Sequence, residues 1–211
     1  MDTLAYILEK YKLQPKRMPC EIPNMGRNNL PELFNELGFK IGMEIGVYRG
    51  QYSEILCKGI PGLKLFGVDP WKIYKPDYRD FSKQEYLTNA HKEALERLKP
   101  YNSELIWGYS MDAVKNFDDN MLDFVFIDGN HEFPYVTQDI IQWTKKVRPG
   151  GIVSGHDYLE RAGKRNTLHV IAAINGYTHA YRIYPWFVIG TKAIVPGEIR
   201  DRSRSWMFVK E

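Results

Sequence analysis

The chain has 211 residues, 44% of them hydrophobic, and a formal net charge of +3. This length fits one globular domain with a short extension, and the small charge argues against nucleic acid as a partner. No apolar run approaches the roughly 18–20 residues that cross a bilayer, so we expect no membrane contact. Two cysteines, Cys20 and Cys57, cannot build a disulfide framework, and the first residues lack the basic segment of a signal peptide. We therefore expect a reduced, cytoplasmic protein, and the sequence leaves a homo-oligomer open.

Residues 1–38 predict an N-terminal helical extension. Apolar residues recur at helical spacing from residue 4 to residue 13. Residues 15–29 are rich in proline, asparagine and glycine, which is typical of a loop. Residues 31–37 predict a second helix that ends at Gly38.

From residue 39 to residue 211, apolar runs of strand length alternate with helical patterns. The expected strands are 41–47, 63–68, 104–107, 122–127, 151–154, 180–189 and 205–209. The expected helices are 52–58, 83–98, 111–116, 134–147 and 165–174. This alternation predicts an α/β, Rossmann-like, doubly wound fold with a mainly parallel seven-stranded sheet and helices on both faces.

Chemically useful side chains follow the ends of the expected strands. They are Gly46, Asp69, Ser110, Asp128, His156 and Asp157. Ligands of such a sheet bind beyond the carboxyl ends of the strands, so we expect these residues to share one site. An acidic residue after a strand can also cap a helix. Capping explains any one of these positions more easily than all of them together.

A glycine turn, Glu44-x-Gly46-x-x-x-Gly50, follows the first strand of this sheet. Glycines there let the chain turn tightly and let a ligand approach backbone amides. The spacing is not the Gly-x-Gly-x-x-Gly of dinucleotide-binding folds, and on its own it is a weak signal. The next strand ends in Gly67-Val68-Asp69, where a carboxylate can accept hydrogen bonds from both hydroxyls of a ribose.

Together with two later segments, these motifs resemble those of a known family. Gly108-Tyr109-Ser110-Met111-Asp112 and the strand 123–129 complete a set similar to the four ordered motifs of class I S-adenosylmethionine-dependent methyltransferases. The chain is similar to small-molecule O-methyltransferases related to catechol O-methyltransferase. It is also similar to a bacterial and phage group that carries an Asp-Gly-x-His motif and a later Gly-His-Asp-Tyr motif. The resemblance covers about residues 40–190 and implies that residues 39–211 form an S-adenosylmethionine-binding domain.

The resemblance also implies which residues bind the cofactor. The set is Glu44, Gly46, Tyr48, Gly50, Ser53, Asp69, Ser110, Met111 and Asp128. The residues of the glycine turn would wrap the methionine part, and Ser53 would bind its carboxylate at a helix N-terminus. Asp69 would hold the ribose, and Ser110 and Met111 would flank the adenine. Asp128 would meet the amino group, a metal ion, or both.

Oxygen methylation requires that the acceptor be held in line with the sulfonium and lose its proton. A divalent ion that lowers the hydroxyl pKa, Mg²⁺ or Mn²⁺, is one device, and Asp128, His156 and Asp157 are its candidate ligands. Otherwise His156 and Asp157 only orient the loop. His131, near the start of the next helix, is the other candidate and would act with Asp128 as a general base. It also has a structural interpretation, as a histidine bonded to backbone.

An aromatic and basic stretch, residues 71–86, follows the expected ribose-binding strand. It is interpreted as a lid over the acceptor, as a solvated loop, or as a nucleic-acid surface. The function that the resemblance implies is methyl transfer to a hydroxyl of a small molecule or of a sugar-bearing metabolite. The alternatives are a methyltransferase of protein or nucleic acid, and a non-catalytic protein that retains the cofactor fold.

Overall fold

The computed structural model describes residues 2–73, 83–160 and 168–211. Its centre is an eight-stranded sheet with the order β1-β7-β8-β6-β5-β2-β3-β4. The strands are β1 (Cys20–Ile22), β2 (Ile41–Ile45), β3 (Lys64–Asp69), β4 (Ser103–Trp107), β5 (Leu122–Ile127), β6 (Val147–Tyr158), β7 (Trp186–Ile189) and β8 (Arg204–Val209). The strands pair in parallel except where β8 lies antiparallel to β6 and β7. The predicted α/β fold is therefore confirmed, with one strand more than expected.

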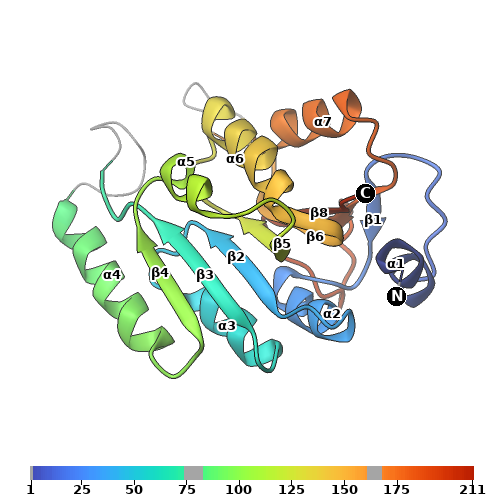
Figure 1. Cartoon of the computed structure of the whole chain (residues 1–211). Coiled ribbons are helices and arrows are strands. Elements are labelled where there is room, and N and C mark those ends of the chain that lie inside the picture. Colours follow the sequence, from blue (N-terminus) through green and yellow to red (C-terminus); the bar gives the residue numbers. More distant parts are fainter. Residues whose placement is uncertain (1, 74–82, 161–167) are drawn as a thin grey trace.

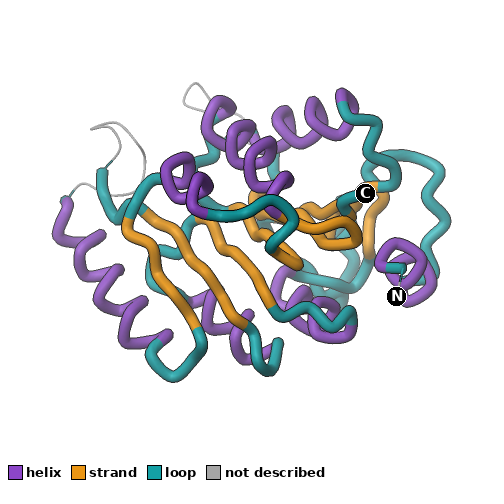
Figure 2. Tube along the Cα trace, in the orientation of Figure 1, coloured by secondary structure: helices purple, strands orange, loops and turns teal. Residues whose placement is uncertain are grey.

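Helices cover both faces of the sheet, as Figure 1 and Figure 2 show. They are α1 (Thr3–Lys10), α2 (Leu30–Glu36), α3 (Gln51–Gly59), α4 (Gln84–Leu98), α5 (Ser110–Ala113), α6 (Phe133–Lys146) and α7 (Val170–Ala180), with short 3₁₀ turns at Arg27–Asn29 and Val114–Asn116. In Figure 1, α5, α6 and α7 lie above the sheet and α2 and α3 below it. No helix in the described ranges combines the length and the apolar character needed to cross a bilayer.

The central strand β5 is buried on both faces. Val125 and Ile127 pack in the core beneath α6, whereas Phe124 and Phe126 pack in the core on the side of α1, α2 and α3. Both cores need apolar side chains, so the strand is an unbroken apolar run instead of an alternating one. This is the reason that its predicted boundaries, 122–127, match the structure.

The additional strand, β1, comes from the segment that was expected to be a loop. Its residues pair in parallel with β7, Cys20 with Phe187 and Ile22 with Ile189. A strand of this length carries no readable alternation, and its partner lies near the other end of the sequence. Residues of the predicted N-terminal extension therefore contribute to the same sheet as the later strands.

Helix α7 begins and ends later than predicted. The expected helix ended at residue 174, before Asn175 and Gly176, but the described helix runs on to Ala180. Val170, Ile174 and Thr178 are buried on one face of it, which packs against α6 and β6. Gly176 is on the exposed side and interrupts no contact, so burial of the other face outweighs its low helix propensity.

The order of the strands predicts a crevice at the carboxyl ends of the central strands. The chain leads outward from β2 to β3 and β4, and then returns to β5 on the other side of β2. The connections after β2 and β5 therefore leave in opposite directions. Open α/β sheets bind ligands at such a switch point, beyond the carboxyl ends of the strands.

Candidate functional site

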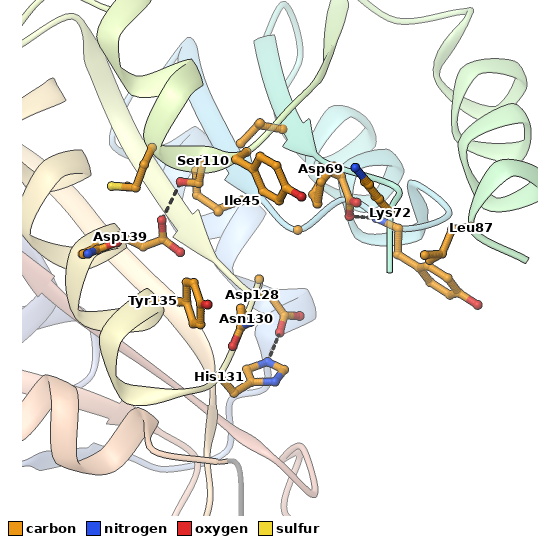
Figure 3. Close-up of a pocket in the computed structure, with 18 of the residues that line it drawn as sticks. Ile45, Asp69, Lys72, Leu87, Ser110, Asp128, Asn130, His131, Tyr135 and Asp139 are labelled. Atoms are coloured by element: carbon orange, nitrogen blue, oxygen red, sulfur yellow. Dashed lines mark hydrogen bonds and ion pairs between the residues drawn. The ribbon is translucent and has the colours of Figure 1, made fainter. Parts of the chain in front are cut away.

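A cavity of about 520 Å³ lies at this switch point, in the size range of small-molecule sites. Residues that follow β2, β3, β4 and β5 line it, together with residues of α6 (Figure 3). Of the predicted site residues, the cavity wall includes Gly46, Tyr48, Asp69, Ser110, Met111, Asp128 and His131.

The turn after β2 brings backbone to the cavity wall. Gly46 has a φ of +91°, and a Cβ there would lie 2.2 Å from the carbonyl oxygen of Asp128. A larger residue therefore fits neither the dihedral nor the space. Gly50 caps α3 with a φ of +70° and lies against Ala94 of α4. The turn is thus packed tightly between β5 and α4.

Asp69, at the end of β3, is fixed by two backbone amides. Tyr48 donates to its Oδ2 at 2.9 Å, and Trp71 donates to its Oδ1 at 2.7 Å. Burial raises the pKa of Asp69, and these amides oppose that shift. A carboxylate oxygen can accept more than one hydrogen bond, so the group still offers acceptors to a ligand in the cavity.

Glu44 and Ser53 lie behind the glycine turn. Both are almost fully buried, and the Ser53 hydroxyl donates a hydrogen bond to the Glu44 carboxyl group. Burial raises the pKa of Glu44 to about 8, although the bond from Ser53 opposes the shift. Neither residue is part of the described cavity wall. They are joined to each other by this hydrogen bond, behind the turn.

At the far side of the cavity, Ser110 joins α5 to α6. Its hydroxyl accepts from the indole Nε1 of Trp143 at 2.7 Å and donates to Oδ1 of Asp139 at 2.5 Å. Figure 3 shows Asp139 beside Ser110 at the cavity wall. Asp139 lies within a helix and belongs to no motif, so the sequence pattern does not predict its place at the site.

Below the switch point, His131 joins two carboxylates. Its Nε2 lies 3.4 Å from Oδ1 of Asp128 and 2.9 Å from Oδ2 of Asp157. Burial lowers the pKa of His131, but the bonds to both carboxylates outweigh it and raise the pKa to about 10. Burial raises the pKa of Asp157, but hydrogen bonds with His131 and His156 outweigh it and hold this pKa far below its usual range. These contacts favour the charged imidazolium form of His131, which has no lone pair for a proton.

The same three side chains are candidate metal ligands. One ligand atom each from Asp128, His131 and Asp157 lies within 4.8 Å of the others. The predicted set had His156 instead of His131. Nδ1 of His156 is 3.4 Å from Asp157 and 3.8 Å from Asp128, so it lies at the margin of this group. Two carboxylates and an imidazole suit Mn²⁺, Fe²⁺ or Zn²⁺ better than Mg²⁺.

A cation from the N-terminal segment also reaches this group. Nη1 of Arg27 is 3.4 Å from Oδ2 of Asp128, and the guanidinium lies over the ring of Tyr52. Asp201, in the loop between β7 and β8, accepts from the Arg27 backbone amide at 2.6 Å. Arg27 stands in a segment that the sequence predicts to be a loop, outside the resemblance, so its place at the site carries no signal in the sequence.

Part of the expected lid is core instead. Trp71 is fully buried, and its indole donates to the carbonyl oxygen of Tyr48 at 2.8 Å. It packs with Leu87, Ala90 and Ala94 of α4, so it anchors the segment after β3 and cannot open with a lid. Residues 74–82 of the expected lid lie outside the described residues.

Comparisons with known proteins show the family to which the chain belongs. A family model described as a methyltransferase domain matches residues 43–158. An uncharacterized protein of Acanthamoeba polyphaga mimivirus is 24% identical over 159 residues, 74% of this chain and 70% of the relative.

Solved structures share the fold over nearly the whole chain. An O-methyltransferase from Bacillus cereus, in complex with SAH, has a TM-score of 0.59 and 16% identity, covering 99% of this chain and 87% of that one. The O-methyltransferase TomG from Streptomyces achromogenes, involved in tomaymycin synthesis and solved with SAM, has a TM-score of 0.60 and 16% identity, covering 100% and 91%. The family match spans more than half of the chain, which therefore belongs to the methyltransferase domain family and has the fold of S-adenosylmethionine-dependent O-methyltransferases.

Proposed function

We propose that the protein transfers a methyl group from S-adenosylmethionine to a hydroxyl of a small molecule or a sugar-bearing metabolite. In this proposal it is a relative of the bacterial and phage small-molecule O-methyltransferases. The observation that carries it is the cavity itself, which runs from Asp69 to His131 and meets a carboxylate–imidazole group at that end. One cavity thus offers places for a nucleoside and for a reacting hydroxyl.

The cofactor end fits S-adenosylmethionine, which supplies an electrophilic methyl group on a sulfonium. In the proposal Asp69 accepts hydrogen bonds from the ribose, and the turn at Gly46 gives the methionine part access to backbone. Met111 provides apolar contact for the base. Glu44 and Ser53 act from below, by supporting the turn through their hydrogen bond. Two structural neighbours were solved with SAH and SAM, which supports S-adenosylmethionine as the cofactor.

The acceptor end fits the removal of a proton from a hydroxyl. We propose that Asp128 and Asp157 hold a divalent ion there, with nitrogen from His131 or His156. Such an ion would lower the pKa of a hydroxyl, so that the acceptor would release its proton to solvent near neutral pH. The positions of both carboxylates around one imidazole support the ion site. Arg27 limits the negative charge of Asp128 on the other side.

A metal-free mechanism makes His131 the general base, with Asp128 orienting it. A base must be unprotonated, and in the described contacts the imidazole holds its proton between two carboxylates. His131 would act only if another group took its place beside Asp128 and Asp157. A divalent ion bound between the same carboxylates takes the place of that proton, whereas a metal-free mechanism leaves it on the imidazole, and for this reason the ion is the preferred account.

The test combines binding with transfer. The purified protein is titrated with S-adenosylmethionine and S-adenosylhomocysteine in a calorimeter, then incubated with labelled cofactor and small-molecule extract, with and without chelator. We expect binding of both nucleosides and transfer of label that chelator abolishes and Mn²⁺ restores. Label on protein or nucleic acid instead would support the alternative acceptors. Absence of binding would favour the non-catalytic alternative and contradict the proposal.

A further inference from the structure

The buried carboxyl group of Asp139 lies on the wall of the cavity, and the mechanism proposed above gives it no role. Its side chain is 5% exposed, and it projects from α6 toward the cavity beside Ser110 (Figure 3). A buried carboxylate without compensating hydrogen bonds is costly, so its position calls for a partner. In the described part of the chain, the partner of this carboxyl group is the Ser110 hydroxyl.

The direction of the hydrogen bonds around Ser110 is fixed by Trp143. An indole N–H can only donate, so the Ser110 oxygen accepts from Trp143 and its own hydrogen goes to Oδ1 of Asp139. The chain of donors thus ends on one oxygen of the carboxyl group. Oδ2 remains, and it lies 3.8 Å from the point that a Cβ at Gly129 would occupy. Gly129 and Asp139 both line the cavity, and Gly129 has no side chain that would cover this oxygen.

The position matches that of a nucleobase in the proposed cofactor site. The ribose is assigned to Asp69 at the end of β3, and the base therefore extends toward the next strand end, where Ser110 and Met111 follow β4. Ser110 cannot donate to a base, since its hydrogen is engaged with Asp139. Met111 offers only a weak acceptor. An adenine there carries an exocyclic amine that needs an acceptor.

We propose that Asp139 recognises the adenine of the cofactor by accepting a hydrogen bond from its exocyclic amine through Oδ2. This inference rests on the proposed function and adds a specificity-determining residue to it. A structural role, in which Asp139 only links α6 to Ser110, predicts the same contacts without any effect on the choice of base.

Burial raises the pKa of Asp139 to about 7, while the bond from Ser110 opposes the shift. The experiment is therefore done at pH 8.5, where the group is ionised and both oxygens can only accept. S-adenosylhomocysteine and S-inosylhomocysteine are titrated into the protein in a calorimeter. The inosine analogue has a carbonyl oxygen in place of the amine, so it exchanges a donor for an acceptor.

Three proteins are compared: the wild type, Asp139→Asn and Asp112→Asn. The first substitution keeps shape and the acceptor for Ser110 but places an amide donor at the position of Oδ2. Asp112 is a matched control on α5, where it is exposed and paired with Lys115. We expect the wild type and the control to bind the adenosine compound about tenfold or more tightly than the inosine compound. This ratio corresponds to one buried hydrogen bond to a charged group. Asp139→Asn should lose or reverse that preference.

The outcomes separate the two levels of the proposal. Equal preference for adenosine in the wild type and Asp139→Asn, with matching thermal unfolding, would overturn the role of Asp139 and leave the proposed function intact. Failure of the wild type and the Asp112→Asn control to bind either compound would reject the proposed function, and the role of Asp139 with it. Asp139→Ala is a second variant, and it should weaken binding of the adenosine compound more than of the inosine compound.

Discussion

The two ends of the cavity are built in different ways. At the cofactor end, the side chains and amides come from consecutive strand ends, and Asp69 is held by the backbone of Tyr48 and Trp71. At the acceptor end, Asp128 and His131 meet Asp157 from β6 and Arg27 from the N-terminal segment. The first end is fixed by local backbone geometry, and the second depends on segments far apart in the sequence.

Backbone strain is present at both ends, because Tyr48 and Trp71 at the cofactor end have φ values of +49° and +38°. Asp157 has a φ of +56°, in the left-handed region that is unfavourable for a residue with a side chain. It lies where the pairing of β6 with β8 shifts register, between Gly155 and Tyr158. The irregularity turns this carboxylate toward His131. Such strain is typical of functional sites, where surrounding contacts hold a residue in place.

The largest expected effect is the loss of stability caused by a substitution at Gly46, at the cofactor end. Gly46→Ala places a Cβ against the carbonyl oxygen of Asp128, whereas Gly62→Ala, at a φ of +77° with nothing within 4 Å, adds only dihedral strain. We expect Gly62→Ala to cost about 1–2 kcal/mol of unfolding free energy and Gly46→Ala at least about 3 kcal/mol. Urea unfolding measures both. Equal losses would mean that the turn is not packed as described.

Removal of Asp69 should affect binding without disrupting the fold. Asp69→Ala loses the acceptors assigned to the ribose. We expect this loss to weaken the binding of S-adenosylhomocysteine by on the order of 1.5–3 kcal/mol, roughly 10- to 150-fold in affinity. Calorimetry on the folded variant measures this loss, and the control is Asp119→Ala, whose exposed carboxylate pairs with Lys146. Unchanged affinity of Asp69→Ala would place the ribose elsewhere.

The contrast explains which parts of the site could be predicted. The glycine turn and Asp69 belong to short sequence segments, so their spacing predicts their positions at one edge of the sheet. Their binding roles remain predictions. Arg27 reaches Asp128 only because β1 joins β7, a pairing with no local signal. Asp139 faces the cavity only through the register of α6. Long-range packing, and not residue type, decides these contacts.

At the cofactor end, the buried carboxyl group of Glu44 makes the stability of the fold depend on pH. The pKa of Glu44 is raised to about 8 from an ordinary value near 4.5, chiefly by burial. Between these values the folded protein keeps a proton that the unfolded chain has lost, so this group lowers stability as pH rises toward 8. Glutamine mimics the neutral acid. We therefore expect Glu44→Gln to have little effect at pH 5 and to raise the unfolding free energy by at least about 1 kcal/mol at pH 8.5.

Thermal or urea unfolding of the cofactor-free protein at both pH values measures this difference. Other groups titrate in the same range, but they are common to the wild type and the variant and cancel in the comparison. Asp119→Asn is the matched control, because its carboxylate is exposed and its pKa is lowered, chiefly by the hydrogen bond with Lys146. A stability difference for Glu44→Gln that shrinks as pH rises would contradict the assigned shift.

The smallest expected effect concerns the acceptor end. If Asp128 helps to hold a divalent ion, the guanidinium of Arg27, 3.4 Å from its Oδ2, repels that ion. Arg27→Gln should then bind Mn²⁺ more tightly. Because the Arg27 side chain is 34% exposed, solvent screens the interaction, and we expect only about a two- to fivefold change.

Mn²⁺ titration followed by electron paramagnetic resonance measures this affinity directly, without a known acceptor. Arg49→Gln is the matched control, since Arg49 is similarly exposed but pairs with Glu93 beside the cofactor end. The gain for Arg27→Gln should diminish as ionic strength rises from about 0.05 to 0.5 M, because salt screens the charge that has been removed. A gain that is equal in both variants would reflect net charge alone. No gain in either would mean that Asp128 is not a ligand, and the metal-free account, with His131 released from its carboxylates, would then be preferred.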